Sequence, residues 1–481
     1  MKKVFSVILT AVTAAGLLAG CGSSSDSGSS SASTTASTAA TAAATTADAA
    51  ATTASATAGK NLPDIGTNPI TINLWDIQTE DPGKTIAEDA VARFMKDYPN
   101  VTVNETHQQN DNYKQQLVVA MSSGQAPDMY ISWGGGPMYE YYNSGFCNDI
   151  TDFYNTYDHP DFIDAAIAQG SYDGKLLAIP FNGIAGCCVF YNKTIFKDVG
   201  IEVPSTIDEL EAACEKLKAA GYIPFSLANG SKWTGSMYYM YLVARHSGNA
   251  EFDAAYTQKD GGSFTSDAFI FAGEKIQDWV RKGYFQDGVN SLSTDDGQDR
   301  QLLYNNTCAM MLHGSWQCSS INNDNADWYK ENIGVFKFPE DTGAGDNGVP
   351  QNVEVGTAID TAFSFNCWNA DKTVDEKKLA ACYILATQYY NDETYNQAKI
   401  TQENRVLNIK GYENQISDPN MQTVSGIFNS ASNVQLWYDQ YLPASVTEVH
   451  KNCMTELFGL TATPEEIGKE QDTAMQAALA Q

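Results

Sequence analysis

The chain has 481 residues, of which 29 are Lys or Arg and 58 are Asp or Glu, giving a formal charge of −29. A chain of this length has room for two or three domains, and its 43% hydrophobic content excludes a largely disordered protein. So acidic a chain lacks the basic face that phosphates require, which excludes nucleic acid as an expected partner. Its charge also repels anionic lipid, so membrane attachment would need a covalent or inserted anchor.

The N-terminus has the pattern of a targeting segment. Lys2 and Lys3 precede an apolar stretch, residues 4–18, that is too short for a typical membrane-spanning helix. Residues 1–20 are therefore predicted to be a secretory signal peptide. The segment Leu18-Ala19-Gly20-Cys21 resembles the lipobox of bacterial lipoproteins. This resemblance implies cleavage before Cys21 and lipid attachment to its sulfur; the alternative is an ordinary signal in which Cys21 is incidental.

A low-complexity segment follows. Between residues 22 and 60, every residue except Asp26, Asp48 and Lys60 is Ser, Ala, Thr or Gly. Such a segment has almost nothing to bury and cannot offset the entropy of ordering it. Residues 21–67 are predicted to be the lipidated cysteine and a disordered tether.

Nine cysteines remain after Cys21, and their number and spacing do not form a disulfide framework. No C-x-x-C pair is present, so neither a zinc ribbon nor a thioredoxin motif is indicated. We predict buried thiols that behave as small apolar side chains, with structural disulfides as the alternative.

Alternating strand and helix patterns begin near residue 68. Residues 70–75 alternate like a strand, and residues 84–98 carry a helical apolar stripe. Strand, helix and strand at this spacing predict parallel pairing in an open α/β sheet, whose ligands bind beyond the carboxyl ends of the strands. The other predicted strands are 101–103, 129–133, 177–181, 187–191, 308–312 and 333–338. The other predicted helices are 113–123, a helix capped by Ser205 that ends near 220, 268–282, 375–390 and 464–480, with a Gly-rich loop at 342–348.

Several segments, in order along the chain, resemble extracellular solute-binding proteins of the maltose-binding type. They are residues 72–94, Ala126-Pro127-Asp128 with Trp133, Ile179-Pro180-Phe181 followed by 190–193, the segment 309–316 and the aromatic stretch 435–439. The resemblance implies a two-lobed periplasmic-binding-protein-like α/β fold, with three crossing segments and a ligand cleft between the lobes. It places residues 68–181 and 339–407 in the N-terminal lobe and residues 182–338 and 408–481 in the C-terminal lobe. The crossings are expected near Pro180-Phe181, Phe338-Pro339 and Leu407.

The same resemblance implies a carbohydrate ligand. A sugar ring has an apolar C–H face, on which an indole can stack, and a polar rim that Asp, Glu, Asn and Gln can bind. Gly134-Gly135-Gly136 stands where maltose-binding protein has charged residues, which puts maltodextrin in doubt but not carbohydrate. The predicted binding residues are Gln78, Glu80, Trp133, Gly134, Asn182, Trp233, Ser315, Trp316, Trp437 and Asp439.

No sequence motif predicts catalysis. The chain has no G-x-S-x-G elbow, no phosphate-binding loop and no H-E-x-x-H spacing. We therefore predict no enzymatic activity, no cofactor and no bound metal; residues 295–299 and 322–327 are predicted to be solvated loops rather than calcium sites. A glycosidase needs only two carboxylates, so 58 acids leave that alternative open.

The expected function follows from the resemblance. It implies a lipid-anchored receptor on the outer face of a bacterial cell membrane, which binds a sugar and delivers it to the permease subunits of an ABC importer. A monomer is expected, held at the membrane only by its lipid. The alternatives are a secreted carbohydrate-active enzyme and a binding protein for a solute other than a sugar.

Overall fold

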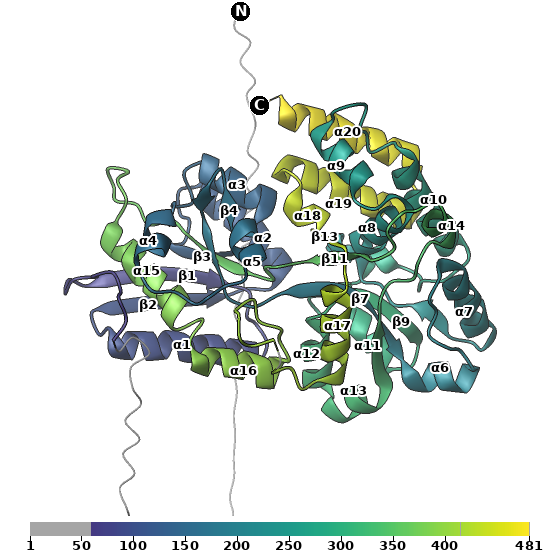
Figure 1. Cartoon of the computed structure of the whole chain (residues 1–481), viewed down its shortest axis with the longest axis horizontal. Helices are drawn as coiled ribbons and strands as arrows, with labels where there is room; N and C mark the ends of the chain where they lie inside the picture. The colour runs from purple at the N-terminus through teal and green to yellow at the C-terminus, as the bar shows by residue number, and fades with distance from the viewer. Residues whose placement is uncertain (1–58, 414, 481) are drawn as a thin grey trace, which may run out of the picture. The chain divides into compact units, whose positions relative to one another are not determined.

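The computed structural model describes residues 59–413 and 415–480 (Figure 1). The predicted signal peptide, Cys21 and the tether up to residue 58 lie outside the described residues. Residues 60–67, which were predicted to belong to the tether, instead pack on the body: Pro63 and Ile65 are buried, and Lys60 Nζ donates to Gln388 Oε1 at 2.5 Å. The physical reason is composition, because this stretch carries apolar side chains that the preceding Ser/Ala/Thr segment lacks.

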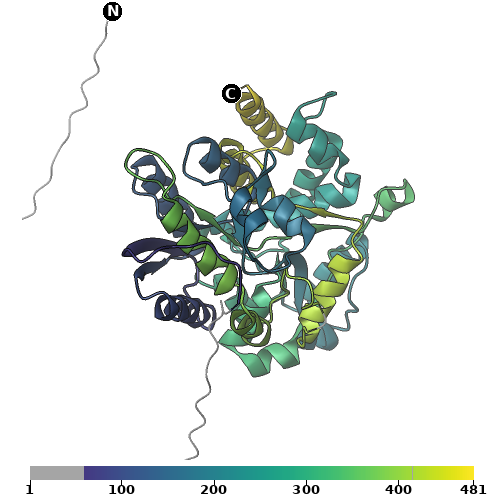
Figure 2. The same ribbon diagram turned by 60° about the vertical axis from the view of Figure 1, so that its left-hand side comes forward.

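The first sheet has the strand order β2 (Val101–His107), β1 (Ile70–Asp76), β3 (Met129–Ser132), β12 (Ala362–Phe365) and β6 (Ala178–Pro180). β1 is parallel to β2 and to β3, as the strand and helix spacing predicts, whereas β12 is antiparallel to both of its neighbours. α1 (Gly83–Asp97) and α15 (Glu376–Gln388) contact one another, and α15 lies beside β1 (Figure 2). The remaining elements here are α2 (Asn110–Ser122), α3 (Gly135–Asn143), α4 (Thr151–Thr156), α5 (Asp164–Gln169), β4 (Ser171–Tyr172), β5 (Lys175–Leu176) and α16 (Glu393–Glu403).

The second sheet has the order β13 (Asn433–Gln435), β11 (Val353–Thr357), β7 (Ala185–Asn192), β9 (Cys308–Gly314) and β8 (Ile223–Phe225), and β10 (Ile333–Phe336) also pairs with β7. β7 is antiparallel to β9, β10 and β11. α8 (Trp233–Ser247) is buried from Thr234 to Arg245, because most residues of this stretch are apolar or aromatic.

The other helices around the second sheet are α6 (Lys193–Val199), α7 (Ile207–Ala219), α9 (Ala250–Thr257), α10 (Asp267–Arg281), α11 (Gln298–Tyr304), α12 (Gln317–Asp324), α13 (Ala326–Asn332), α14 (Thr342–Asp346), α17 (Pro419–Asn429), α18 (Tyr438–Tyr441), α19 (Ala444–Gly459) and α20 (Pro464–Leu479), with 3-10 turns at Asn229–Ser231 and Val289–Ser291. In the part of the chain that the structure describes, no helix combines the length and the apolarity needed to cross a bilayer.

Two local predictions were wrong. The N-cap of α7 is Thr206, whose side chain accepts from Glu209 N at 3.2 Å, whereas Ser205 instead donates to the Glu209 carboxylate. The segment 342–348 is not only a loop, because it contains the short helix α14. Asp341 caps that helix by accepting from Ala344 N at 3.2 Å, which supports a turn despite two glycines.

The chain passes between the two sheets at residues 181–184, at 358–361 and after α16. The second crossing therefore does not lie at Phe338-Pro339, because β11 still pairs with β7 and β13 of the second sheet. The crossing segments bond to one another: Asp360 N donates to Gly183 O at 2.8 Å, and Ile184 N donates to Val406 O at 2.9 Å. Gly183 has a φ of +87°, and a Cβ there would lie 2.1 Å from Val406 O, so this close approach requires glycine.

The nine cysteines after Cys21 are all free and buried. Burial raises the pKa of the Cys147 thiol to about 11, and burial likewise raises the pKa of Cys308 to about 12. The thiols of Cys147 and Cys308 therefore stay protonated at neutral pH, and the buried cysteines pack as small apolar side chains.

Candidate functional site

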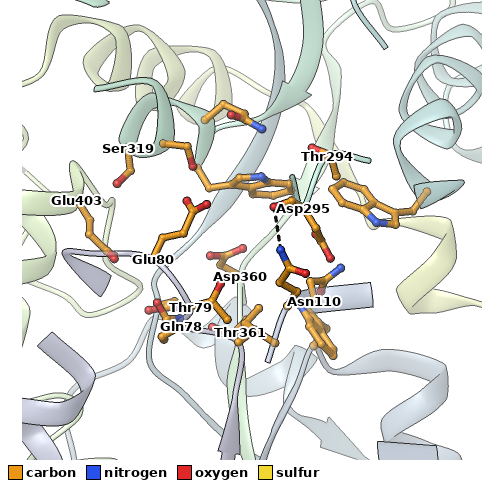
Figure 3. Close-up of a pocket in the computed structure, with 18 of the residues that line it drawn as sticks. Gln78, Thr79, Glu80, Asn110, Thr294, Asp295, Ser319, Asp360, Thr361 and Glu403 are labelled. Carbon is orange, nitrogen blue, oxygen red and sulfur yellow. Dashed lines mark hydrogen bonds between the residues drawn. The ribbon is translucent and has the colours of Figure 1, made fainter. Parts of the chain in front are cut away.

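A pocket of about 240 Å³ is lined by residues from both sheets and from the crossing segments (Figure 3). A cavity needs only roughly 10–15 Å³ to hold one water molecule, so this pocket accommodates a much larger ligand. In Figure 3, Gln78, Thr79 and Thr361 lie at one edge, Ser319 and Thr294 lie at the opposite edge, and Glu80 and Asp360 project between them. The lining elements include the loop after β1 and the residues that follow β9, both at the carboxyl ends of strands, where α/β sheets place ligands.

Three indoles from the second-sheet elements form an aromatic wall, consisting of Trp233, Trp316 and Trp437. The ring centroid of Trp316 lies 6.0 Å from that of Trp233 and 6.0 Å from that of Trp437. Trp316 follows β9, and its ring lies over Gly314, where a Cβ would come within 2.2 Å of the indole. Glycine at this position therefore leaves the space that the Trp316 ring occupies.

Trp133 lies in the same pocket but comes from the first-sheet elements, directly after β3. Its ring packs edge-on against Tyr113, with the centroids 6.0 Å apart, and Lys114 Nζ lies 4.6 Å from the Trp133 centroid. Trp133 is half-buried, so part of the indole stays accessible. The pocket thus offers flat apolar surface from both sides.

The loop after β1 supplies a polar edge. Asp76 Oδ1 accepts from Gln78 N at 2.8 Å, which fixes the start of the loop, and Gln78, Thr79, Glu80 and Asp81 all line the pocket. Gly83 is the first residue of α1 and is buried. A Cβ at that position would lie 2.6 Å from Gln78 Oε1, so the loop can approach α1 only because residue 83 is glycine.

Three lining residues carry a buried side-chain oxygen without a hydrogen-bond partner in the described structure. They are Asn182 Oδ1, Thr361 Oγ1 and Gln317 Oε1. Buried polar atoms are nearly always hydrogen-bonded, because an unsatisfied one costs free energy. These three atoms are therefore positioned to bind the polar groups of a ligand.

Charged side chains form the floor of the pocket beside the crossing segments. Arg405 pairs with Asp360 at 2.6 Å and with Glu403 at 3.3 Å, and the buried Lys399 also pairs with Glu403. Burial by itself would raise the pKa of Glu403, but Lys399 and Arg405 lower it overall, whereas burial leaves the pKa of Asp360 raised. The floor is thus a compact cluster of two cations and two carboxylates.

Contacts between the two groups of elements cross the pocket. Asp295 Oδ2, in the segment before α11, accepts from Asp111 N of α2 at 2.8 Å, and Trp233 Nε1 donates to Asp111 Oδ1 at 3.1 Å. Burial, followed by repulsion from Asp111, raises the pKa of Asp295 to about 6. The prediction of a solvated loop at residues 295–299 was therefore wrong, because Asp295 lines the pocket and Asp299 is buried.

The structure brings eight of the ten predicted binding residues to the pocket lining: Gln78, Glu80, Trp133, Asn182, Trp233, Trp316, Trp437 and Asp439. The other two, Gly134 and Ser315, lie outside the lining. Gly134 is the N-cap of α3, and a Cβ there would lie 2.6 Å from Gln169 O; Ser315 Oγ is buried and accepts from Gly186 N at 3.2 Å. The sequence interpretation missed Asn110, Lys114, Asp295, Arg300, Asp360, Glu403 and Arg405. No motif marks them as ligand-binding residues, and Asp295 was considered only as part of a possible calcium site.

Two groups of side chains in the described residues have the composition of a metal site. Asp76, Glu105 and His107 lie at the ends of β1 and β2, and Cys453, Glu456 and Glu470 lie on α19 and α20. In the first group, burial and repulsion from Asp76 raise the pKa of Glu105 to about 7, and the hydrogen bond that His107 donates to the Asp76 carboxylate raises the pKa of His107. The Asp76–His107 contact of 2.7 Å and the hydrogen bond from Tyr390 to Glu105 indicate an internally paired network.

A family model described as "Bacterial extracellular solute-binding protein" matches residues 76–362. This chain belongs to that family. The predicted resemblance is thereby confirmed at the level of the family.

Sequence relatives of this family member include an uncharacterized ABC transporter extracellular-binding protein of Pyrococcus horikoshii, 26% identical over 242 residues, which are 49% of this chain and 53% of the relative. A multiple sugar-binding protein of Streptococcus mutans is 31% identical over 172 residues, which are 34% of this chain and 39% of the relative. The chain thus spans about half the length, or less, of these relatives.

Solved structures of similar fold match a much larger share of the solute-binding protein. One, from work on xylan utilization by the thermophilic bacterium Caldanaerobius polysaccharolyticus, is 25% identical with a TM-score of 0.73 and covers 84% of this chain and 99% of that chain. A chitin oligosaccharide binding protein has 22% identity and a TM-score of 0.75, covering 86% of this chain and all of that one. These likenesses confirm the predicted two-lobed α/β fold.

Proposed function

We propose that this solute-binding protein is a receptor for a carbohydrate, bound in the pocket between the two sheets. The observation that carries the proposal is the pairing of four indoles with buried, unpartnered oxygens in one pocket. An indole offers a flat apolar surface to the C–H face of a sugar ring, and amide and hydroxyl oxygens bind its hydroxyls. The names of the relatives, which include a multiple sugar-binding protein and a chitin oligosaccharide binding protein, support the same class of ligand.

Delivery to the permease subunits of an ABC importer is the second part of the proposal. It is supported by membership of an extracellular solute-binding family and by the Pyrococcus relative, an ABC transporter extracellular-binding protein. The predicted signal peptide and the lipobox-like segment at Cys21 support a lipid anchor on the outer face of the membrane. We also propose that the body acts as a monomer without enzymatic activity.

Closure about the three crossing segments provides the mechanism. The lining comes from both lobes, so a sugar contacts both at once only when the pocket is closed, and it therefore shifts the population toward the closed form. The closed form is the shape that a permease would recognise.

Isothermal titration calorimetry against hexose, pentose and uronic-acid oligosaccharides tests this proposal. We expect at least one sugar to bind and no new reducing ends to appear on incubation. Trp316→Ala should weaken binding about 30-fold or more, as at aromatic hot spots. Trp328→Ala, a half-buried indole of the same region outside the pocket lining, is the matched control. If no oligosaccharide of the panel binds, the proposal is overturned.

A further inference from the structure

We propose that the pocket selects uncharged oligosaccharides and rejects sugars that carry a carboxylate, sulfate or phosphate. This inference rests on the proposed function and narrows its ligand class. Its basis is the pairing of the charged groups in the pocket lining. Each of the three cations already faces carboxylates of the chain, and two further carboxylates of the lining, Asp81 and Asp295, form no ion pair among the described residues.

Arg405 is occupied by its own chain. Its guanidinium lies 2.6 Å from Asp360 Oδ2 and 3.3 Å from Glu403 Oε2, and all three residues belong to α16 or to the crossing segments. Since these segments hydrogen-bond to one another, the pairing does not depend on how far the lobes are closed. An incoming anion would have to displace a carboxylate from a mostly buried ion pair, which is unfavourable.

Arg300 is occupied in a similar way. Its Nε lies 2.7 Å from Asp324 Oδ2, and its Nη2 lies 3.4 Å from Glu80 Oε1. Asp324 ends α12, in the same lobe as Arg300, so opening the pocket separates Arg300 from Glu80 but leaves the stronger contact with Asp324 intact. The guanidinium is thus paired before a ligand enters as well as afterwards.

Lys114 is the third cation of the lining, and it is shared among carboxylates. Its Nζ lies 3.7 Å from Asp439 Oδ2 and 4.6 Å from the centre of the Trp133 ring. Lys114 is also close enough to Asp295 to offset part of the rise in pKa that burial and Asp111 cause there. An anion beside Lys114 would therefore be repelled by two carboxylates from the second-sheet side of the pocket, Asp439 and Asp295.

The remaining carboxylates strengthen the exclusion. Asp295 and Asp81 line the pocket, and within the described residues neither forms an ion pair with Lys, Arg or His. An anionic sugar would lose its hydration and approach these carboxylates without gaining a free cation, and such uncompensated charge is the strongest means of rejecting a wrong ligand. A neutral sugar loses only hydroxyl hydration, which the amide and hydroxyl oxygens of the lining can replace.

Matched pairs of sugars test the inference by titration calorimetry at pH 7 and low salt. The probes are tetrasaccharides of glucose, galactose and mannose and the corresponding glucuronate, galacturonate and mannuronate oligomers. We expect the best neutral sugar to bind at least about 100-fold more tightly than its acidic counterpart, the discrimination expected when an unpaired charge is rejected. An acidic oligomer that binds within tenfold of its neutral counterpart overturns the inference but leaves the sugar receptor intact. If neither class binds, the proposed function fails, and this inference fails with it.

A gain-of-function variant tests the physical cause. Asp324 lies outside the pocket lining, so Asp324→Asn releases Arg300 within its own lobe without altering the wall that the ligand would contact. We expect the preference for the neutral sugar to fall about tenfold, since a charge-assisted hydrogen bond becomes available to an anion. Asp327→Asn, three residues along the chain and also outside the lining, is the matched control and should leave the preference unchanged. An unchanged preference in a folded Asp324→Asn protein would show that paired cations are not what excludes anions.

Discussion

The two groups of elements that enclose the pocket present different chemistry to it. The second-sheet side contributes the aromatic wall of Trp233, Trp316 and Trp437, whereas the first-sheet side contributes one indole, Trp133, and the polar loop after β1. Under the proposed function, one lobe supplies the surface on which a ring stacks, and the other supplies most of the groups that recognise its rim. The difference predicts that the two sides respond differently to the same kind of substitution.

The buried titratable groups of the two sides also differ. Burial lowers the pKa of His313 and His450, both in second-sheet elements, to about 4. On the first-sheet side, burial raises the pKa of Glu105 to about 7. Lowering the pH therefore destabilises the folded second-sheet side, where buried histidines must become charged. On the first-sheet side, the protonation of Glu105 at lower pH favours the folded state.

The largest effect is expected from the acid response of His450. Its Nε2 faces Ser236 Oγ at 2.6 Å and its Nδ1 faces Gln471 Oε1 at 2.8 Å, deep in the second-sheet core. Because the pKa is lowered in the folded state, the stability that neutral His450 provides is fully present above the unfolded pKa near 6.5 and is lost as the pH falls toward 4. The loss amounts to about 3 kcal/mol at pH 4.

Urea unfolding of the wild type and of His450→Gln at pH 7 and pH 4.5 measures this effect. We expect the variant to be less stable at pH 7 and to lose less stability on acidification. His159→Gln is the control, because His159 lies near the surface of the first-sheet side and is bonded to its neighbour Pro160. Equal acid sensitivity in the wild type and in His450→Gln would assign the effect to other groups.

The next effect concerns the aromatic wall itself. Gly314→Ala places a methyl group 2.2 Å from atoms of the Trp316 indole, so the ring must move out of its position. We expect affinity for the best-binding sugar to fall by about 2 kcal/mol, or roughly 30-fold, as if the indole itself were removed.

Tryptophan fluorescence and titration calorimetry together test the Gly314→Ala prediction. Gly426→Ala in α17 is the matched control, since a Cβ at that position meets no atom within 4 Å and should leave binding unchanged. Unaltered affinity in Gly314→Ala would mean that the aromatic wall is not the main stacking surface.

The aromatic wall shows what the sequence could predict. Trp316 follows a strongly apolar strand and Trp133 follows another, so the positions of both at strand ends can be inferred from local pattern alone. The parallel pairing of β1 with β2 and β3 was predictable for the same reason, because alternating strands and helices leave few other arrangements. These features depend on residues that are near one another in the chain.

The ion pairs of the pocket could not be predicted from the sequence. Arg300 and Glu80 are separated by 220 residues, and Arg405 and Asp360 by 45, and no local spacing indicates either pair. The second crossing was misplaced at Phe338-Pro339 for a related reason: whether β11 pairs with β7 or with the first sheet depends on contacts across the fold and not on β11 itself. A single sequence does not show which residues or strands, distant along the chain, pair with one another in the fold.

A smaller effect is expected for the single indole of the opposite side. Trp133→Ala removes stacking surface but leaves three other indoles, and Lys114 loses its contact with the ring. We expect affinity to fall by about 1 to 1.5 kcal/mol, or roughly tenfold, which is the range of an individual aromatic contact. Calorimetry with the same sugar measures it, and Trp75→Ala, which alters a half-buried indole of the same sheet outside the lining, is the control. A loss equal to that of Trp316→Ala would make the two sides equivalent in stacking.

The smallest effect should come from the polar loop. Gln78→Ala removes an amide that lies largely buried at the pocket edge, and a single neutral hydrogen bond contributes about 1 kcal/mol, or roughly fivefold in affinity. Gln115→Ala, on the exposed face of α2 and outside the lining, should change nothing. Because hydroxyl geometry differs among sugars while the apolar ring face is shared, Gln78→Ala should alter the ranking of sugars more than Trp316→Ala does. If Gln78→Ala weakened the binding of every sugar equally, we would infer that the aromatic wall determines sugar recognition and that the polar loop has only a structural role.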